Sequence, residues 1–294
     1  MRFGYISMNS ASGIRPDVIA RALEERGFDS LWLPEHSHIP TSRDSPYPAG
    51  GELPAGYLHM MAPFVSLTAA AMVTNHLTLA TGVCLLLEHD LLDLACTAAT
   101  LDVLSGGRLL LGVGVGWNRE ELANHRPDLP FGKRYGAMRE RVAALRKIWG
   151  EDEPAFSGTW DHFSASWVYP KPLRGRVPIA LGNSGPLGIR HAAEYADQWC
   201  PIDTMLAGHD GRPDVVGGVG RFRALVAEMG RDPDRVPISL FMFSRPTPAR
   251  LERYAPLGLE RLVLSAPNAE LRDESSTLRH LDELAPIVAE WRGR

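Results

Sequence analysis

The sequence has 294 residues, 45% of them hydrophobic, and a formal net charge of −4 at pH 7. This length accommodates one or two domains, or a single α/β barrel, around a core of ordinary size. The weak negative charge excludes the basic surface typical of nucleic-acid-binding proteins, and no apolar run approaches the roughly 20 residues of a membrane-spanning helix.

The N-terminal segment and the cysteines bear on the compartment. The segment MRFGYISMNSASG lacks the apolar stretch of a secretory signal peptide. Cys84, Cys96 and Cys200 are odd in number and form no CxxC pair, as is typical of free thiols in a reducing compartment. We therefore expect a cytoplasmic protein.

Short apolar runs recur along the chain, and each predicts a β-strand. Most lack strict alternation of apolar and polar residues, which is typical of parallel strands buried on both faces. The predicted strands cover residues 2–7, 30–36, 77–86, 108–114, 177–183, 197–202, 236–243 and 261–267.

Helical patterns lie between these runs, several with a glycine just beyond the last apolar residue, as in C′ capping. Thr247 and Pro248 have the order of an N-cap and a first-turn proline. The last helix contains Pro286, where we expect a kink. The predicted helices cover 17–26 (before Gly27), 90–104 (before Ser105-Gly106-Gly107), 138–149 (before Gly150), 222–229 (before Gly230), 247–258 and 278–291.

Strands that alternate with helices over this length predict a (β/α)₈ barrel, with a doubly wound open sheet as the competing architecture. No low-complexity linker divides the chain, so residues 1–294 are predicted to form one domain. Two segments interrupt the alternation: a loop at 37–59 rich in Pro and Gly, and an aromatic segment at 156–176 that predicts a small hairpin. In a barrel, both would lie over the mouth where active sites form.

The segment LDVLSGGRLLLGVGVGWNREE, residues 101–121, predicts a helix, a turn, a buried strand and then alternating glycines. Gly112, Gly114 and Gly116 at the carboxyl end of a strand would let a ligand approach the backbone closely. Asn118 and Glu121 have the spacing of a capping box and predict a helix start. The GxGxG pattern is a weak dinucleotide signal, because the third glycine of that fingerprint is missing.

Glu35, His36 and His38 follow the second predicted strand. Histidine is suited to proton transfer near neutral pH, so His36 is a candidate catalytic residue; the alternative is a ring that merely hydrogen-bonds at a strand end. The His36-x-His38 spacing also matches metal ligands of some barrel hydrolases. The other strand ends lack the further ligands that such a site needs, so we expect no metal.

Two further turns are candidate binding elements. The segment LGNSGPL, residues 181–187, follows the fifth predicted strand and opens a helix, whose N-terminus suits an anion. Ser184 there either caps the helix or joins the site. Gly82 lies inside the third predicted strand. A glycine there indicates a β-bulge or the close approach of a ligand to the backbone; the alternative is tight packing inside the barrel. Trp117 either lines a pocket or covers the barrel end. Glu120 is interpreted as structural, a negative charge that is favourable in the first turn of a helix.

Three segments together resemble the luciferase-like monooxygenase superfamily, and most closely its branch that uses the deazaflavin coenzyme F420. They are LWLPEH, ATLDVLSGGRLLLGVGVGWNREE and PIALGNSGPLGIRHAAEYADQW, and the similarity extends from Phe3 to the last helix. The resemblance implies a (β/α)₈ barrel with the ring system in the mouth and the tail phosphate at the turn after strand five. It also suggests a homodimer.

The resemblance further implies roles by position. Glu35 and His36 match an acidic–His pair whose His faces the reactive part of the ring. Gly82-Val83 matches a bulge that backs the deazaflavin, often through a non-proline cis peptide, and 182–184 matches the phosphate turn. Trp117 stands where the family's sugar-phosphate dehydrogenases have an acidic residue, so their proton donor is not carried over.

The sequence therefore predicts an F420-dependent oxidoreductase that transfers a hydride between the cofactor and a small organic substrate. The alternatives are an FMN-dependent monooxygenase of the same family, a metal-dependent barrel hydrolase and a cofactor-binding protein without catalysis. We expect His36 to be catalytic and Trp117, Tyr57 and His59 to contact substrate. The expected cofactor-binding residues are Glu35, His36, Thr81, Gly82, Val83, Gly114, Gly116, Trp117, Gly182, Asn183 and Ser184.

Overall fold

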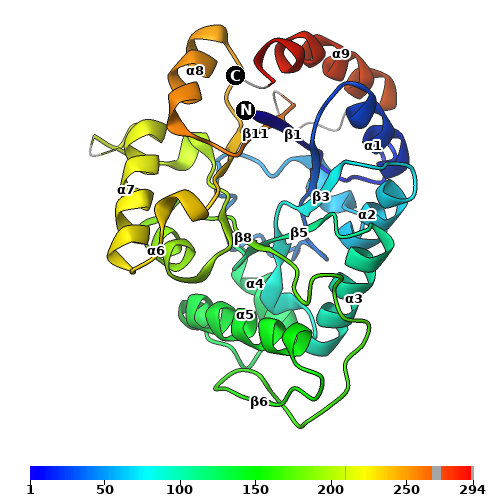
Figure 1. The fold of residues 1–294 in the computed structure, drawn as a ribbon, viewed down its shortest axis with the longest axis vertical. Helices are drawn as coiled ribbons and strands as arrows, with labels where there is room; N and C mark the ends of the chain where they lie inside the picture. Colours follow the sequence, from blue (N-terminus) through cyan, green and yellow to red (C-terminus); the bar gives the residue numbers. More distant parts are fainter. Residues whose placement is uncertain (209, 267–272, 293–294) are drawn as a thin grey trace.

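Parallel β-strands form a ring at the centre of the molecule, and α-helices surround this ring (Figure 1). The computed structural model describes residues 1–208, 210–266 and 273–292. The strands of the ring are β1 (Arg2–Ile6), β2 (Ser30–Leu33), β3 (Thr78–Thr81), β4 (Cys84–Leu85), β5 (Leu109–Gly114), β8 (Ile179–Leu181), β9 (Gln198–Trp199), β10 (Ser239–Met242) and β11 (Arg261–Ser265). They pair in the order β10-β11-β1-β2-β3-β5-β8-β9, and β4 also pairs with β5.

Two parallel bridges close the ring between β9 and β10. Trp199 pairs with Ile238, and Ile202 pairs with Phe241. The (β/α)₈ barrel is therefore confirmed, and the open-sheet alternative is wrong. The third predicted strand is divided into β3 and β4, and Pro267, the predicted end of the last strand, lies outside the described residues.

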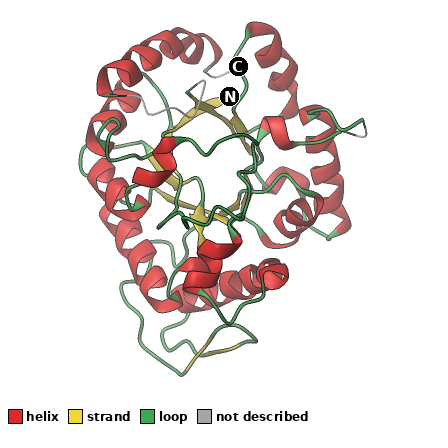
Figure 2. Ribbon diagram, turned by 180° about the vertical axis from the view of Figure 1, so that it is seen from behind, coloured by secondary structure: helices red, strands yellow, loops and turns green. Residues whose placement is uncertain are grey.

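Helices form the outer layer (Figure 2). None of the described helices is both long and apolar enough to cross a membrane. The α-helices are α1 (Pro16–Glu25), α2 (Pro63–Ala71), α3 (Leu91–Leu104), α4 (Arg119–His125), α5 (Arg134–Gly150), α6 (Pro186–Tyr195), α7 (Val215–Glu228), α8 (Pro248–Tyr254) and α9 (Glu274–Trp291). The 3₁₀ turns are η1 (Ala55–His59), η2 (Leu86–Glu88), η3 (Phe131–Lys133), η4 (Asp203–Met205), η5 (Pro233–Arg235) and η6 (Ala255–Leu257).

Most of the helix-end signals are confirmed. Gly27 and Gly230 follow their helices with φ of 76° and 72°, in the left-handed region that favours glycine. Thr247 caps α8 by accepting the Arg250 N–H. Gly150 is instead the last residue of α5, and Glu151 takes the C-cap in an extended conformation. Pro286 lies within α9, which continues through it.

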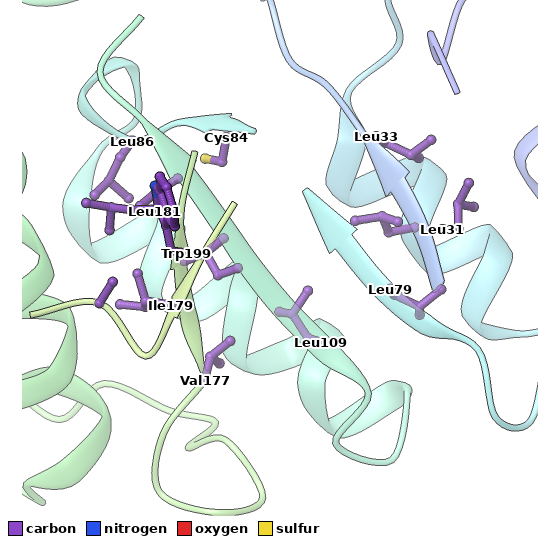
Figure 3. Packing of buried hydrophobic residues seen from close by; sticks show 14 of the residues in the cluster. Leu31, Leu33, Leu79, Cys84, Leu86, Leu109, Val177, Ile179, Leu181 and Trp199 are labelled. Carbon is purple, nitrogen blue, oxygen red and sulfur yellow. The ribbon is translucent and has the colours of Figure 1, made fainter. Parts of the chain in front are cut away.

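The strands are buried on both faces, as their composition predicts. Toward the helices, residues such as Leu31, Leu79, Leu109 and Ile179 form a large apolar cluster (Figure 3). Inside the ring, Trp32 and Phe241 meet edge to face with centroids 5.1 Å apart. They are packed among smaller side chains contributed by the other strands and by the segment after β9: Ile6, Ala80, Leu110, Ala180, Cys200, Ile202 and Val263. Side chains therefore fill the barrel interior.

Both predicted insertions are present. Residues 156–176 contain the hairpin strands β6 (Phe156–Ser157) and β7 (His162–Phe163), which pair antiparallel. The 37–59 loop follows β2 and ends in η1. Arg141 of α5 connects the hairpin segment to the barrel, because it pairs with Asp161 and also donates to the carbonyls of Leu86 and His89.

Gly112 of β5 faces the crowded interior, which makes it a sensitive position. A Cβ there would overlap the Thr81 carbonyl oxygen and lie 3.4 Å from the Trp32 ring. We expect Gly112→Ala to lower the free energy of unfolding by about 1–3 kcal/mol through overpacking. Gly220→Ala is the control, since Gly220 lies inside α7 with nothing within 4 Å. It should raise stability by about 0.5–1 kcal/mol. Urea denaturation measures both, and equal shifts would contradict the assignment.

Candidate active site

The carboxyl ends of the parallel strands share one rim of the barrel, and the predicted site residues lie there. Glu35 and His36 follow β2, and Thr81 ends β3 before residues 82–83. Gly114 ends β5 before residues 115–117, and residues 182–184 follow β8. The register of neighbouring strands brings these four turns together, as the barrel prediction required.

His36 is held at both ring nitrogens. Its side chain is only 6% exposed, and Nδ1 lies 2.6 Å from Oε2 of the fully buried Glu121. The Trp117 indole N–H donates to Nε2 at 3.2 Å. Because an indole can only donate, Nε2 accepts, and the proton of the neutral ring is on Nδ1, donated to Glu121. A ring oriented in this way by a carboxylate can accept a proton at Nε2.

Glu121 was interpreted from the sequence as half of a capping box, and its partnership with His36 was missed. Asn118 does cap α4, since its Oδ1 accepts the N–H groups of Glu120 and Glu121. The Glu121 side chain, however, binds His36. The sequence did place Glu121 in the first helical turn after the strand-end Gly116, close to the predicted site. The capping-box spacing already explained this glutamate, so no role in the site was assigned to it.

Aromatic side chains surround the His36 ring. Its centroid lies 5.4 Å from that of Tyr57 and 5.5 Å from that of Trp117. Tyr47, which the sequence did not single out, contacts both Tyr57 and Trp117. Burial and a hydrogen bond with Tyr47 raise the pKa of Tyr57, so its hydroxyl stays protonated. The loop at 37–59 thus builds one wall of the site.

His59 does not join this aromatic group. Its side chain is exposed, and its backbone carbonyl accepts the Ala11 N–H at 2.8 Å. His38 also has separate partners, since Ser37 Oγ and Asn124 Nδ2 lie 2.9 and 2.8 Å from its two ring nitrogens. His36 and His38 therefore engage different groups. Neither belongs to a cluster of three potential metal ligands among the residues that the structure describes.

Glu35 binds the segment after β3. Its Oε2 accepts the Leu85 N–H at 2.8 Å and lies 2.9 Å from His89 Nε2. Burial opposes ionisation, but these hydrogen bonds outweigh it and hold the pKa of Glu35 below its usual value. Cys84 is the third member of a cluster with ligand atoms within 4.8 Å. Burial raises the pKa of the Cys84 thiol, and the contacts of Glu35 in this cluster are its hydrogen bonds with Leu85 and His89.

The turn after β3 has the features that the resemblance implied. The Gly82–Val83 peptide bond is cis. A Cβ at Gly114 or Gly182 would lie 2.6 or 2.5 Å from a Val83 methyl group, so glycine at both positions makes room for Val83. Thr81 is fully buried, and its hydroxyl donates to the Gly112 carbonyl at 2.7 Å. Thr81 thus supports the strand pair with its side chain.

The turn after β8 contains an unpaired donor. Asn183 Oδ1 accepts the Tyr135 hydroxyl at 2.8 Å, and its carbonyl accepts the Trp199 indole N–H. Its Nδ2 is buried and has no hydrogen-bond partner among the described residues. The helix-capping interpretation of Ser184 is wrong, because Gly185 is the N-cap of α6 and Ser184 Oγ accepts the Ile202 N–H at 2.9 Å.

Known proteins similar to this chain include enzymes that use F420. An uncharacterized protein of Mycobacterium tuberculosis is 35% identical over 285 residues, which cover 96% of this chain and 97% of that protein. The 5,10-methylenetetrahydromethanopterin reductase of Methanolobus tindarius is 25% identical over 82% of this chain and 64% of its own length. The F420-dependent glucose-6-phosphate dehydrogenase of Amycolatopsis mediterranei is 27% identical over 67% and 56%, respectively.

Solved structures share the fold at low identity. An F420-dependent secondary alcohol dehydrogenase in complex with an F420–acetone adduct has a TM-score of 0.73 and 19% identity, over 99% of both chains. DmoA from Hyphomicrobium sulfonivorans has a TM-score of 0.76 and 14% identity, over 100% of this chain and 88% of its own. The family model of luciferase-like monooxygenases matches residues 15–294. The chain therefore belongs to the luciferase-like monooxygenase family.

Proposed function

We propose that this protein is an oxidoreductase that transfers a hydride between coenzyme F420 and a small organic substrate. The observation that carries the proposal is the His36 ring at the barrel rim, oriented by Glu121 and flanked by Trp117 and Tyr57. A hydride transfer to or from an alcohol or carbonyl needs a partner that moves a proton, and an imidazole with one unprotonated nitrogen is such a group. The F420 dependence of relatives named above supports the choice of cofactor.

The turn at 182–184 fits the phosphate of such a cofactor. Asn183 Nδ2 is a buried donor with no partner in the part of the chain that the structure describes, and such a group costs free energy unless a ligand or water satisfies it. The turn leads into α6, whose N-terminus favours a negative charge. Tyr135 fixes the amide, because its hydroxyl occupies Oδ1 and leaves Nδ2 as the free group.

Each protein group has a distinct task in this proposal. Coenzyme F420, when bound, supplies the two-electron hydride chemistry. His36 accepts or returns a proton at Nε2, while Glu121 orients the ring through Nδ1 and stabilises its charged form. Tyr57, Tyr47 and Trp117 line the substrate side and exclude water from it. We also propose that His59, at the end of the loop, contacts the substrate.

Titration of the purified protein with F420 and with FMN tests the cofactor. We expect F420 to bind more tightly, as measured by fluorescence quenching or calorimetry. Tighter binding of FMN would overturn the proposal in favour of a flavin monooxygenase. Metal analysis of the same preparation tests the hydrolase alternative, which stoichiometric zinc or manganese would favour.

Asn183→Ala should weaken F420 binding by about 10- to 100-fold. Hydrogen bonds to charged groups contribute about 1.5–3 kcal/mol, and each 1.4 kcal/mol is a tenfold change in Kd. Asn75→Ala is the matched control, because Asn75 is exposed near the start of β3 and should leave Kd unchanged. If Asn183→Ala binds F420 as tightly as the wild type, the phosphate does not contact this amide.

A further inference from the structure

A second carboxyl group lies behind Glu121, farther from His36. Glu88 of η2 is in hydrogen-bond contact with Glu121, and its side chain is only 4% exposed. Both oxygens of Glu88 and Oε1 of Glu121 are buried without a donor from any other described residue. A proton on one carboxyl satisfies the other, because the protonated acid donates across the pair.

The surroundings assign this proton to Glu88. Burial, followed by the charges of Glu121 and Glu35, raises the pKa of Glu88 to about 9 from its usual 4.5. Two adjacent carboxyls cannot both ionise cheaply, so the pair holds one proton at neutral pH. The arrangement is then His36 Nδ1–H to Glu121 carboxylate, with Glu88 as the acid on the far side.

Glu88 and His125 both line a cavity of about 460 Å³ between η2, α4 and the hairpin segment, but the two carboxyl oxygens of Glu88 are enclosed. His125 of α4 is the more open of the two, with a side chain 31% exposed, and its Nε2 lies 3.9 Å from Glu88 Oε2 and 2.7 Å from Ser37 Oγ. Burial, with nearby His38, lowers the pKa of His125, so its ring is neutral at neutral pH. The other ionisable groups that line this cavity are His89, Asp90, Arg126, Arg141, Asp161 and His162.

We propose that Glu121 and Glu88 relay protons between His36 and His125, whose ring meets the water of this cavity. The role rests on the proposed function, in which His36 takes up a proton at Nε2. The ring then passes its Nδ1 proton to Glu121 Oε2 and becomes the neutral tautomer with its proton on Nε2. The carboxyl pair now carries two protons; Glu88 passes one to the neutral His125 ring, which releases it to cavity water, and the other stays shared. One proton enters at Nε2 and one leaves through His125; the reverse sequence supplies a proton at Nε2 and restores the Nδ1–H tautomer.

Proton exchange at His36 distinguishes a relay from a structural role. NMR of the protein without cofactor measures how fast the His36 Nδ1 proton exchanges with water. Glu88→Gln keeps a donor toward Glu121 but cannot pass a proton, so we expect exchange to slow by roughly tenfold or more. Glu88→Asp retains an acid and should restore part of the rate. Glu120→Gln is the matched control, since Glu120 neighbours Glu121 outside the network, and should leave the rate unchanged. An unchanged rate in Glu88→Gln overturns the relay.

Infrared spectroscopy of the same variants checks the stored proton. The wild type should show the carbonyl stretch of a buried carboxylic acid at pH 7, and the band should disappear as pH rises through about 9. It should be absent from Glu88→Gln and present in Glu120→Gln. A band that persists in Glu88→Gln assigns the proton elsewhere and contradicts the proposal. Because neither measurement uses cofactor, a failed relay is distinguishable from failed F420 binding.

Discussion

His36→Asn is expected to lower the turnover of any substrate that the wild-type enzyme accepts by about 10²- to 10⁴-fold, the usual contribution of a general acid or base. Asparagine cannot take up a proton at this position, and the Glu121 carboxylate loses its imidazole partner. Cofactor binding should persist, because Asn183 and the turn after β8 come from other strands. The measurement is kcat from deazaflavin absorbance, together with Kd for F420.

The control for His36→Asn is His76→Asn. His76 is exposed just before β3, and the same substitution there should change kcat by no more than about twofold. If His36→Asn binds F420 normally and turns over at the wild-type rate, His36 has no part in the chemistry. If it loses cofactor binding instead, the ring contributes to binding rather than to proton transfer.

Arg141→Met should have the largest effect on stability, lowering the free energy of unfolding by about 3–5 kcal/mol. The Arg141 and Asp161 side chains are 3% and 5% exposed, and two N–H groups of the guanidinium bind the two carboxylate oxygens. Methionine fills a similar volume but leaves Asp161 as a buried charge, and the carbonyls of Leu86 and His89 also lose their donor. Arg126, 3.8 Å from Asp161, offsets only part of the loss.

Arg139→Met provides the comparison on the same helix. Arg139 pairs with Glu194 at 3.1 Å, but the two side chains are 56% and 38% exposed. Water screens such a pair, so the expected change is below about 1 kcal/mol. Urea denaturation followed by circular dichroism measures both variants. Equal losses would show that burial of the Arg141–Asp161 pair does not matter.

The strands of the fold were predictable because burial on both faces leaves continuous apolar runs, as in 109–114 and 261–265. Most helix ends were predictable from local capping chemistry, such as Asp90 and Thr247. α2 was not marked, because its sequence PFVSLTAAA is apolar on most sides and shows no helical stripe. The break between β3 and β4 was not predicted as a strand end, although Gly82 inside the run 77–86 was interpreted as a bulge, a close ligand or tight packing.

The site was predictable where one residue marks one strand end, as for His36 and Trp117. It was not predictable where function depends on which side chains meet. Glu121 and Glu88 are 33 positions apart in the sequence, and only the packing of η2 against α4 brings them together. Gly114 and Gly182 were expected to leave backbone open to a ligand, yet the structure shows that each also accommodates Val83. The sequence alone does not show whether a glycine leaves space for a ligand or for a side chain of the protein.

The packing of Trp32 and Phe241 inside the barrel restricts how substrate and product can reach the site. Side chains fill the interior of the ring, so organic molecules reach His36 from the rim at the carboxyl ends of the strands. A ligand bound at this rim would cover His36 and separate it from the solvent there. In the relay that we propose, protons leave through His125 and the cavity beside η2, so His36 would still exchange protons with solvent while the ligand is bound.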